Sequence, residues 1–309
     1  MAPRVLCIGE CMAELGSDGA GGYRLGFGGD TLNTALYMAR LLGPGQVGYV
    51  TRLGDDPYSL RMRQAWEAEG IDCGLVETVV GATVGLYAID TDAAGEHSFT
   101  YWRGEAPARE LFTRGNWHVR AEAMGQAAQV YFSGISLAVM PPEGRDRLIA
   151  AAAAARAGGA LVAVDPNHRP RLWSAAEAGA WIARAYGAAS AALTSAEEEQ
   201  TLFPDSGEDP PWPQTACAEV IAKTGAAGAS VAAGGTVGHV PGVAAGKVVD
   251  TTGAGDAFNA AYLAARLCGA PPVEAARHGC ALGARVVAHR GAIIPRAAMQ
   301  DLIDGFPRG

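Results

Sequence analysis

The chain has little charge and few aromatic side chains for its 309 residues, and it lacks a long hydrophobic run free of breaks. Charged residues make up 18% of it and aromatic residues 7%. Two stretches without Lys, Arg, Asp or Glu, 123–142 and 224–246, contain glutamines and prolines or many glycines. Neither is therefore predicted to cross a bilayer as a helix. The formal net charge of −8 argues against broad binding to nucleic acid or to an anionic membrane.

Cysteine is scarce and unpatterned. The six cysteines include no Cys-x-x-Cys pair, which favours a reduced, intracellular chain over a disulfide framework. The first ten residues lack the apolar core of a signal peptide. What is abundant is hydrophobic sequence, at 49%, in an otherwise ordinary globular composition. We therefore expect a cytoplasmic protein with a large core, in which a few local basic groups bind any anionic ligand.

Short apolar runs alternate with helix-length segments through the first two thirds of the chain. The runs expected to be buried strands are Arg4–Gly9, Gln46–Thr51, Val130–Gly134, Leu161–Asp165 and Ala191–Thr194. The expected helices are Asp30–Leu42, Pro57–Gly70, Pro142–Ala157 and Ala175–Tyr186, followed by 255–268 and 272–288 near the end. This alternation predicts an α/β fold with a parallel sheet and helices on both faces. The length favours two domains on average, but α/β folds often use it for one, and we expect a single domain over 1–309.

Two segments interrupt the alternation. Residues 10–27 are short and punctuated by glycine, and 83–103 reads as two alternating strands around an Asp-Ala-Ala-Gly-Glu turn at 92–96. Strands inserted between strand–helix units usually form a separate small sheet. We interpret 10–27 and 83–103 as a lid over the strand ends, where open α/β sheets bind ligands.

The most informative stretch is 250–258, which reads Asp-Thr-Thr-Gly-Ala-Gly-Asp-Ala-Phe. Apolar residues at helical spacing follow it, so a helix is predicted to begin near Gly255. A glycine-rich turn that leads into a helix presents free backbone N–H groups to an anion, and the glycines let a phosphate approach. Asp256 would lie at the same terminus. The alternative is an ordinary capping aspartate after a glycine turn.

A second glycine-led helix start lies at 28–35, which reads Gly-Gly-Asp-Thr-Leu-Asn-Thr-Ala. Asp30 and Asn33 are one helical turn apart, so both could address sugar hydroxyls. Taken alone, the segment is equally well explained as a capped helix after a turn.

Together these two segments resemble the two signatures of the ribokinase-like, or PfkB-type, carbohydrate kinases, and the resemblance covers essentially the whole chain. Within this family the chain is most similar to the members that phosphorylate 2-keto-3-deoxygluconate (KDG). The strings that carry this closer resemblance are at 8–12, 26–33, 101–103, 133–138, 169–173 and 290–296. The resemblance implies a three-layer sandwich with a mostly parallel central sheet and a small β-sheet lid. It also implies ATP and Mg²⁺ as cofactors and a homo-oligomer, and it leaves dependence on a monovalent cation open.

The resemblance implies a mechanism for the C-terminal motif. Asp256 would accept the proton of the acceptor hydroxyl as that oxygen attacks the γ-phosphoryl group of ATP. The position of Asp256 at a helix terminus predicts a lowered pKa for its carboxyl group. The backbone N–H groups of Gly253, Ala254 and Gly255 would hold the charge that develops on the phosphoryl oxygens. Mg²⁺ would bridge the phosphates with few direct protein ligands.

KDG carries a carboxylate, and a guanidinium suits it. By resemblance, Arg103 and Arg169 bind this group, although Arg169 could instead be a solvated loop residue, as we expect of Arg171. Tyr87 and Tyr101 would close over the substrate, or simply pack the lid sheet. The remaining residues implied to contact the substrate are Gly28, Gly29, Asp30, Asn33 and the backbone around Ile135.

For the nucleotide, Lys223, Gly225 and Gly228 match a family Lys-x-Gly-x-x-Gly turn, which turn chemistry alone could also explain. Family members often carry Asn-x-x-Glu near the metal, but here Ala196 replaces the asparagine. Glu199 is therefore predicted to address the metal only through water, with a solvated glutamate as the alternative. Thr194 is expected to face the nucleotide instead. The six histidines show no metal-ligand spacing. His168 adjoins Arg169 and could line the site, but we interpret it as an ordinary loop histidine.

The resulting prediction is an ATP-dependent kinase that phosphorylates the C6 hydroxyl of KDG. Related kinases of a different sugar acid or of a neutral sugar such as fructose remain the nearest alternatives. A sugar-binding protein without turnover is a different class, against which the intact Asp256 and Gly253–Gly255 turn argue. A dinucleotide-dependent oxidoreductase is disfavoured because no Gly-x-Gly-x-x-Gly follows the first strand.

Overall fold

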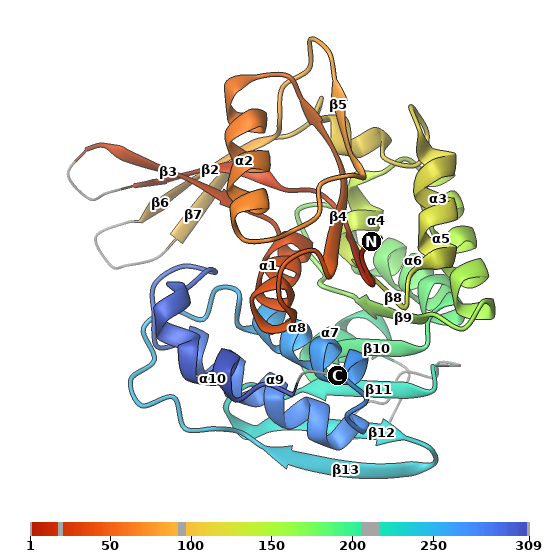
Figure 1. Cartoon of the computed structure of the whole chain (residues 1–309), viewed down its shortest axis with the longest axis vertical. Helices are drawn as coiled ribbons and strands as arrows, with labels where there is room; N and C mark the ends of the chain where they lie inside the picture. The colour runs from red at the N-terminus through yellow and green to blue at the C-terminus, as the bar shows by residue number, and fades with distance from the viewer. Residues whose placement is uncertain (1, 18–20, 92–96, 205–216, 308–309) are drawn as a thin grey trace.

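A large, mostly parallel sheet forms the centre of the molecule (Figure 1). The computed structural model describes residues 2–17, 21–91, 97–204 and 217–307. Nine strands lie in the order β13-β12-β11-β10-β9-β8-β1-β4-β5. Their bounds, in chain order, are β1 Val5–Ile8, β4 Val47–Gly54, β5 Val76–Val79, β8 Gln129–Ser133, β9 Leu161–Asp165, β10 Ala191–Ser195, β11 Glu219–Lys223, β12 Gly228–Ala233 and β13 Thr236–Pro241. All five strands expected from apolar runs are confirmed.

The sheet is parallel from β5 through β11, and β12 and β13 then add an antiparallel edge. In the central strand β1, Cys7 lies opposite Tyr49 on one side and Tyr131 on the other. Because successive side chains point to opposite faces, Val5 and Cys7 enter one apolar core and their neighbours in β1 enter the other. A sheet that is apolar on both faces has to be covered by helices on both faces.

The helices supply these two covers. On one face lie α1 (Asp30–Leu42), α8 (Ala254–Leu267), α9 (Pro272–Val286) and the short α10 (Gln300–Asp304). The other face packs against α3 (Trp117–Gln126), α4 (Gly134–Val139), α5 (Pro142–Ala157) and α6 (Ala175–Ala188). The remaining helices are α2 (Pro57–Ala68) and α7 (Ala196–Leu202). The predicted bounds of α1 and α5 are confirmed to the residue. The helices α3, α4, α7 and α10 were not predicted, and the last three have only six, seven and five residues.

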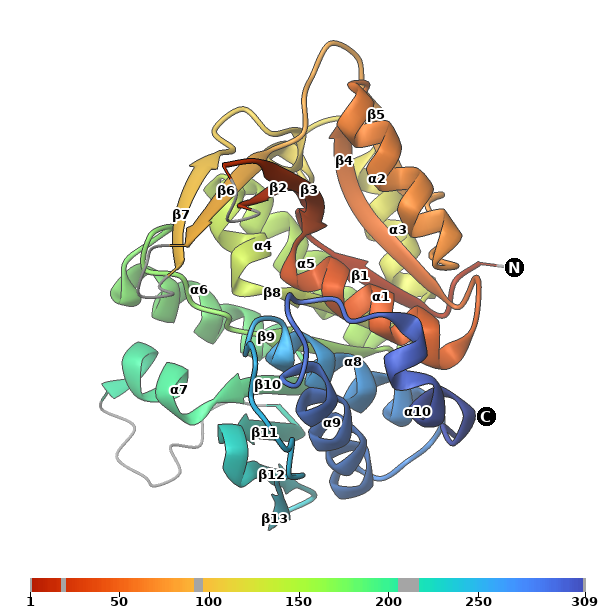
Figure 2. The same ribbon diagram turned by 90° about the vertical axis from the view of Figure 1, so that its left-hand side faces the viewer.

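A smaller sheet of four strands projects from one side of the main sheet (Figures 1 and 2). Its order is β3-β2-β6-β7, with β2 Met12–Ser17, β3 Tyr23–Gly28, β6 Leu86–Thr91 and β7 His97–Trp102. Both segments predicted as a lid are therefore confirmed to be strands of a separate sheet, and the expected β6–β7 hairpin forms. The predicted turn at 92–96 lies outside the described residues. Because β2 starts directly after the carboxyl end of β1, this lid sheet begins at the ligand-binding edge expected of such folds.

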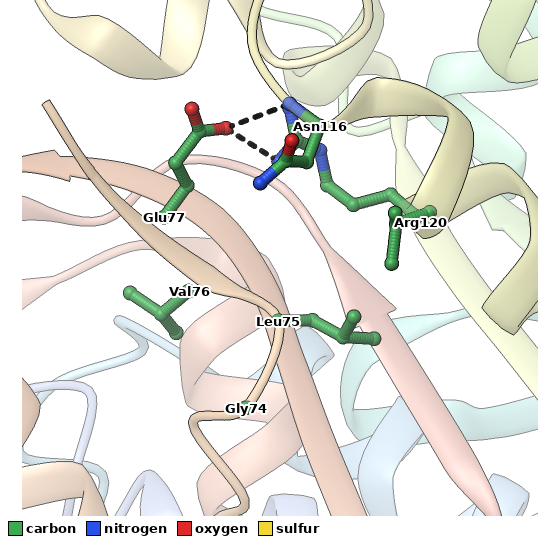
Figure 3. A pocket seen from close by; sticks show the side chains of 7 residues that line it. Gly74, Leu75, Val76, Glu77, Asn116 and Arg120 are labelled. Carbon is green, nitrogen blue, oxygen red and sulfur yellow. Dashed lines mark hydrogen bonds and ion pairs between the residues drawn. The ribbon is translucent and has the colours of Figure 1, made fainter.

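A shallow recess lies at the outermost strand, β5, and is lined by residues of β5 and α3 (Figure 3). Within it, Glu77 accepts a hydrogen bond from Arg120 Nη1 at 2.7 Å and a longer one from the Asn116 amide at 3.4 Å. The Arg52 guanidinium is also 3.3 Å from Glu77. These contacts fasten α3 to the edge of the sheet, so the polar groups of the recess already serve a structural purpose. Within the described ranges, no helix is both long enough and apolar enough to span a bilayer.

Candidate active site

The amino ends of two helices meet at the carboxyl edge of the main sheet. Helix α1 begins at Asp30 and α8 begins at Ala254, and the two helices pack against each other (Figure 2). Asn33 donates from Nδ2 to Asp256 Oδ2 at 2.8 Å. Thr34 Oγ1 donates to the main-chain carbonyl of Asp256 at 3.2 Å. The two glycine-led motifs, which lie at opposite ends of the sequence, therefore share one site.

The turn before α8 has the form expected of an anion site. Gly253 caps the helix with φ +75°, and a Cβ there would lie 2.7 Å from Ala292, so only glycine fits. The Ala254 amide makes a long bond of 3.3 Å to the Thr251 carbonyl. Among the described residues, the Gly253 and Gly255 amides have no acceptor. We call residues 253–255 the phosphate loop, because these N–H groups and the helix dipole favour an anion.

The Asp256 carboxyl differs from the prediction in its pKa. Burial, together with the nearby carboxylates Asp30 and Asp165, raises the pKa of Asp256 to about 7. The hydrogen bond from Asn33 and the charge of Lys223 oppose this shift but do not cancel it. The prediction of a lowered pKa was therefore wrong, because it considered the helix terminus alone and not the neighbouring acids. A carboxyl group that titrates near neutral pH is better matched to proton transfer than an ordinary aspartate.

The glycine pair before α1 permits two close approaches. A Cβ at Gly28 would collide with the Tyr87 hydroxyl of the lid, and a Cβ at Gly29 would collide with the Glu10 carbonyl. Gly28 thus leaves room for the Tyr87 hydroxyl, and Gly29 leaves room for the backbone that leads into β2. Their predicted contact with substrate remains a prediction, but the structure gives each of them a steric reason.

Asp30 and Asn33 both already have protein partners. Asp30 accepts a hydrogen bond of 2.7 Å from Asn167 Nδ2, and burial raises the pKa of Asp30. Asn167 itself is held at φ +35°, which is uncommon for a residue other than glycine. The Oδ1 atom of Asn33 is buried and has no partner among the described residues.

The two arginines predicted to bind the substrate carboxylate differ in exposure and in ion pairing. Arg103 forms an ion pair with Glu10, and its side chain is only 12% exposed. Its guanidinium also lies 5.9 Å from the centre of the Tyr101 ring. Arg169 is exposed and, within the described ranges, makes no ion pair. Its charge opposes the rise in the pKa of Asp30, so Arg169 lies near that carboxyl group.

Arg171 is exposed, but it is not merely solvated as predicted. Its Nη1 donates to the Phe99 carbonyl of lid strand β7 at 2.8 Å. This bond joins the loop after β9 to the lid sheet. His168 lies in a loop, as expected, but its side chain is buried and its main-chain amide donates to Glu198 Oε1 at 3.0 Å.

The two lid tyrosines that were predicted to cover the substrate lie directly opposite each other on neighbouring strands. Tyr87 and Tyr101 face each other across the β6–β7 hairpin, and their rings stack at 5.8 Å between centres. The Tyr87 hydroxyl donates to the Glu14 carboxylate of β2. Lid packing, the alternative considered for both tyrosines, is thus real, and a contact with substrate would be additional to it. Ile135 lies in the first turn of α4, half-buried, with Ser133 as the helix cap.

The predicted nucleotide turn forms between β11 and β12. Gly225 and Gly228 have φ values of +60° and +108°, so the turn requires both glycines. Lys223 ends β11, and its Nζ is 2.7 Å from Asp165 Oδ2. A Cβ at Gly255 would lie 3.8 Å from Lys223 Nζ, so the ammonium group is beside the phosphate loop.

Two predictions on the nucleotide side are corrected by burial. Thr194 is 0% exposed, so its hydroxyl is not presented to a nucleotide. Glu199 is 1% exposed and accepts a 2.6 Å hydrogen bond from Tyr186, so the solvated alternative for it was also wrong. Burial raises the pKa of Glu199 to about 7. The helix that contains it begins after Ser195, whose hydroxyl accepts the Glu198 amide as a cap.

Within the described ranges, no three His, Cys, Asp or Glu side chains converge on a point that could hold an ion. Glu199 Oε2 is buried without a partner, but it is sealed from the cleft. Mg²⁺ usually keeps few protein ligands when it is bound to phosphates. The phosphates of the nucleotide would therefore supply most of its ligands.

Several polar residues of the site were missed by sequence reasoning. Glu10 and Asp165 stand at or just after the carboxyl end of a buried strand, which is a signal that could have identified them. Asn167 follows Asp165 at a spacing of two, and its unusual φ could not be anticipated. Glu14 and Asn259 lie inside regular elements, and nothing in the local sequence marks them.

Comparison with known proteins agrees with this geometry. The family model described as pfkB family carbohydrate kinase matches residues 2–299. The chain is 39% identical to 2-dehydro-3-deoxygluconokinase of Escherichia coli K12, over 97% of this chain and 99% of that protein. The identity to the enzyme of the same name from Dickeya dadantii is 40%, over 96% and 98%. A solved fructokinase from Vibrio cholerae, with fructose, ADP and calcium bound, is 28% identical over 99% of both chains, with a TM-score of 0.80.

Proposed function

The chain belongs to the pfkB family of carbohydrate kinases, and we propose that it transfers the γ-phosphoryl group of ATP to the C6 hydroxyl of KDG, which is also called 2-dehydro-3-deoxygluconate. One observation carries the chemistry: the Asp256 carboxyl is held by Asn33 beside the open amides of the phosphate loop. A proton acceptor and an anion site thus lie next to each other, as in-line phosphoryl transfer requires.

The proposed step uses the residues as follows. The C6 oxygen of KDG attacks the γ-phosphorus, the bond from that phosphorus to the leaving oxygen of ADP breaks, and the hydroxyl proton passes to Asp256. Asn33 orients the Asp256 carboxylate through the 2.8 Å hydrogen bond. The Gly253 and Gly255 amides stabilise charge on the transferred oxygens. When bound with ATP, Mg²⁺ neutralises part of the phosphate charge.

The opposite end of the site is proposed to bind the substrate carboxylate. A guanidinium has five donors, so Arg103 can keep Glu10 on one edge and offer another to the ligand. Arg169 would supply the second cation from the loop after β9. The stacked Tyr87 and Tyr101 would cover the sugar, as their place on the lid sheet suggests.

The cell compartment and the assembly are part of the same proposal. Within the part of the chain that the structure describes, no two cysteines are bonded to each other, which suits a reducing cytoplasm. The lid sheet exposes aromatic side chains at Tyr23, Phe99, Tyr101 and Trp102. Exposed apolar surface of this kind often marks a protein interface, and we propose that the chain forms a homo-oligomer through its lid. Light scattering on the purified protein measures the mass, and a monomer at micromolar concentration would refute this part.

The test is an ATP-consumption assay with Mg²⁺, with and without K⁺, over a panel that includes KDG, its galactonate-derived epimer, gluconate, fructose and ribose. We expect KDG to give the highest kcat/KM, and phosphorus NMR to identify a 6-phosphate as product. Asp256→Asn is the matched control, because it preserves the shape of the side chain and the acceptor for Asn33. Fructose as the best acceptor would instead support the neutral-sugar kinase, and turnover of no acceptor would refute both.

A further inference from the structure

A buried carboxylate that no part of the mechanism above uses lies between the two halves of the site. Asp165 ends strand β9 and is 3% exposed. Its Oδ2 atom accepts hydrogen bonds from Lys223 Nζ at 2.7 Å and from Asn259 Nδ2 at 2.6 Å. Its Oδ1 atom accepts the Asn167 amide at 2.9 Å. Three donors from three separate segments therefore converge on one side chain.

Through these contacts Asp165 is connected to the proposed nucleotide site and to the proposed sugar site. On the nucleotide side, Asp165 holds Lys223, whose ammonium group is beside Gly255 of the phosphate loop. On the sugar side, Asp165 fixes the strained backbone of Asn167, and the Asn167 side chain in turn donates to Asp30 at 2.7 Å. Lys223 and Asp30 are thus joined through a continuous chain of hydrogen bonds, with Asp165 at its centre.

Asn259 contacts both members of the Asp165–Lys223 ion pair. It lies in α8, is fully buried, and donates to Asp165 while its Oδ1 faces Lys223 Nζ at 3.2 Å. The same Nδ2 is 3.2 Å from the buried Tyr131 hydroxyl. A buried ion pair that is supported by neutral donors and acceptors has a fixed geometry, because moving either charge would leave a buried group unpaired.

We propose that Asp165 is a positioning residue, which aims Lys223 at the phosphates of the nucleotide and, through Asn167, fixes Asp30 toward the sugar. This inference rests on the proposed kinase function, because it assigns its two ends to a nucleotide and an acceptor. It does not depend on the acceptor being KDG. Asp165 itself touches no reacting atom.

A positioning role of Asp165 should also change the pKa of Asp256, which a purely structural role would not do. The charged groups that face Asp256 are Asp30 from α1, Asp165 from β9 and Lys223 from β11. The two aspartates raise the pKa of Asp256, and Lys223 lowers it. The tyrosines Tyr37 and Tyr131 also feel its charge, but they are neutral at the pH of the assay. Removing Asp165 and removing Lys223 should therefore move the titration of Asp256 in opposite directions.

The experiment compares Asp165→Asn, Lys223→Met and the wild type with the best acceptor found in the panel. We expect both variants to raise the KM for ATP by about tenfold or more, since each loses a charge-assisted contact. For Asp165→Asn we also expect a higher KM for the acceptor. The acid limb of kcat/KM against pH should move to lower pH in Asp165→Asn and to higher pH in Lys223→Met.

Glu77→Gln is the control, because it weakens a part-buried ion pair with Arg120 at the far edge of the sheet. It should leave both KM values and the pH profile unchanged. Wild-type KM values and an unmoved acid limb in a folded Asp165→Asn would overturn the inference. If Asp165→Asn does not fold, Lys223→Met decides alone, and an unchanged KM for ATP there would overturn it. A wild-type enzyme that consumes no ATP with any acceptor would instead refute the proposed function.

Discussion

The two sides of the site are built from different parts of the chain. On the phosphate side, residues 253–255 offer main-chain amides at the start of a helix, and the local shape is set by one glycine at φ +75°. On the lid side, the side chains proposed to recognise the substrate are already paired, Arg103 with Glu10 and Tyr87 with Glu14. The first side is fixed by local backbone geometry, whereas the second depends on contacts between strands distant in sequence.

This difference determines what a mutation can do on each side. Substitutions other than proline leave a backbone amide in place, so most of them disturb the phosphate loop only where its shape depends on glycine. The lid pairs can be altered one at a time, and each change should affect the acceptor without affecting the transferred phosphoryl group. The predictions below rank these effects from the largest to the smallest.

Gly253→Ala should have the largest effect. The new Cβ would collide with Ala292, and the alanine would have to keep a left-handed backbone conformation. The loop would therefore shift. We expect kcat to fall about a hundred- to a thousandfold, as when an oxyanion donor is lost. The KM for the acceptor should change little. Gly246→Ala is the control, because Gly246 has φ +69° but open space around it. Steady-state kinetics of both variants would separate the loss of the loop from general backbone strain.

Arg103→Ala should have an intermediate effect that is confined to acidic acceptors. Loss of a charge-assisted contact predicts a rise of about ten- to a hundredfold in the KM for KDG. A neutral sugar such as fructose should show no such rise. Because the change also leaves Glu10 buried without its partner, the melting temperature should fall, and Arg103→Ala combined with Glu10→Gln should recover part of that loss. An equal rise in KM for both acceptors would contradict the assignment of Arg103 to the carboxylate.

Arg171→Ala should have the smallest effect. It removes the bond between the loop after β9 and the Phe99 carbonyl of the lid. Since an exposed hydrogen bond contributes about 1 kcal/mol, we expect a few-fold rise in the KM for the acceptor and an unchanged kcat. Hydrogen exchange of the β7 amides should become faster. Unchanged exchange would show that this bond does not hold the lid.

The sequence identified the backbone half of this site better than the side-chain half. A glycine-rich turn before a helix can be recognised from local sequence, so Gly253–Gly255 and Gly28–Gly29 were identified directly. The strands β1, β8 and β9 were equally clear, because each is a short buried apolar run. By contrast, the pairing of Arg103 with Glu10 joins residues 93 positions apart, after β7 and before β2, which no local pattern encodes.

The pKa of Asp256 shows the same limit. Its position at a helix terminus is local and was predicted, but the charges that raise its pKa come from Asp30 and Asp165 on other elements. Glu199 was misplaced for a related reason. The acidic run before it reads as exposed, whereas the Tyr186 hydroxyl bonds to Glu199 and its side chain is buried. Thr194 ends a run that was expected to be a buried strand, and its side chain is buried with that strand. Burial of polar residues at strand ends is a tertiary property.

The most direct test of the account is the pH dependence of kcat/KM for the wild type with KDG and ATP. Asp256 must be ionised to accept a proton, and its pKa is raised to about 7. We therefore predict that activity is full at alkaline pH and declines tenfold per pH unit below about 7, with the residual activity of Asp256→Asn showing no such limb. A wild-type profile that stays flat down to pH 5, or an Asp256→Asn variant with wild-type turnover, would contradict the assignment of Asp256 as the base.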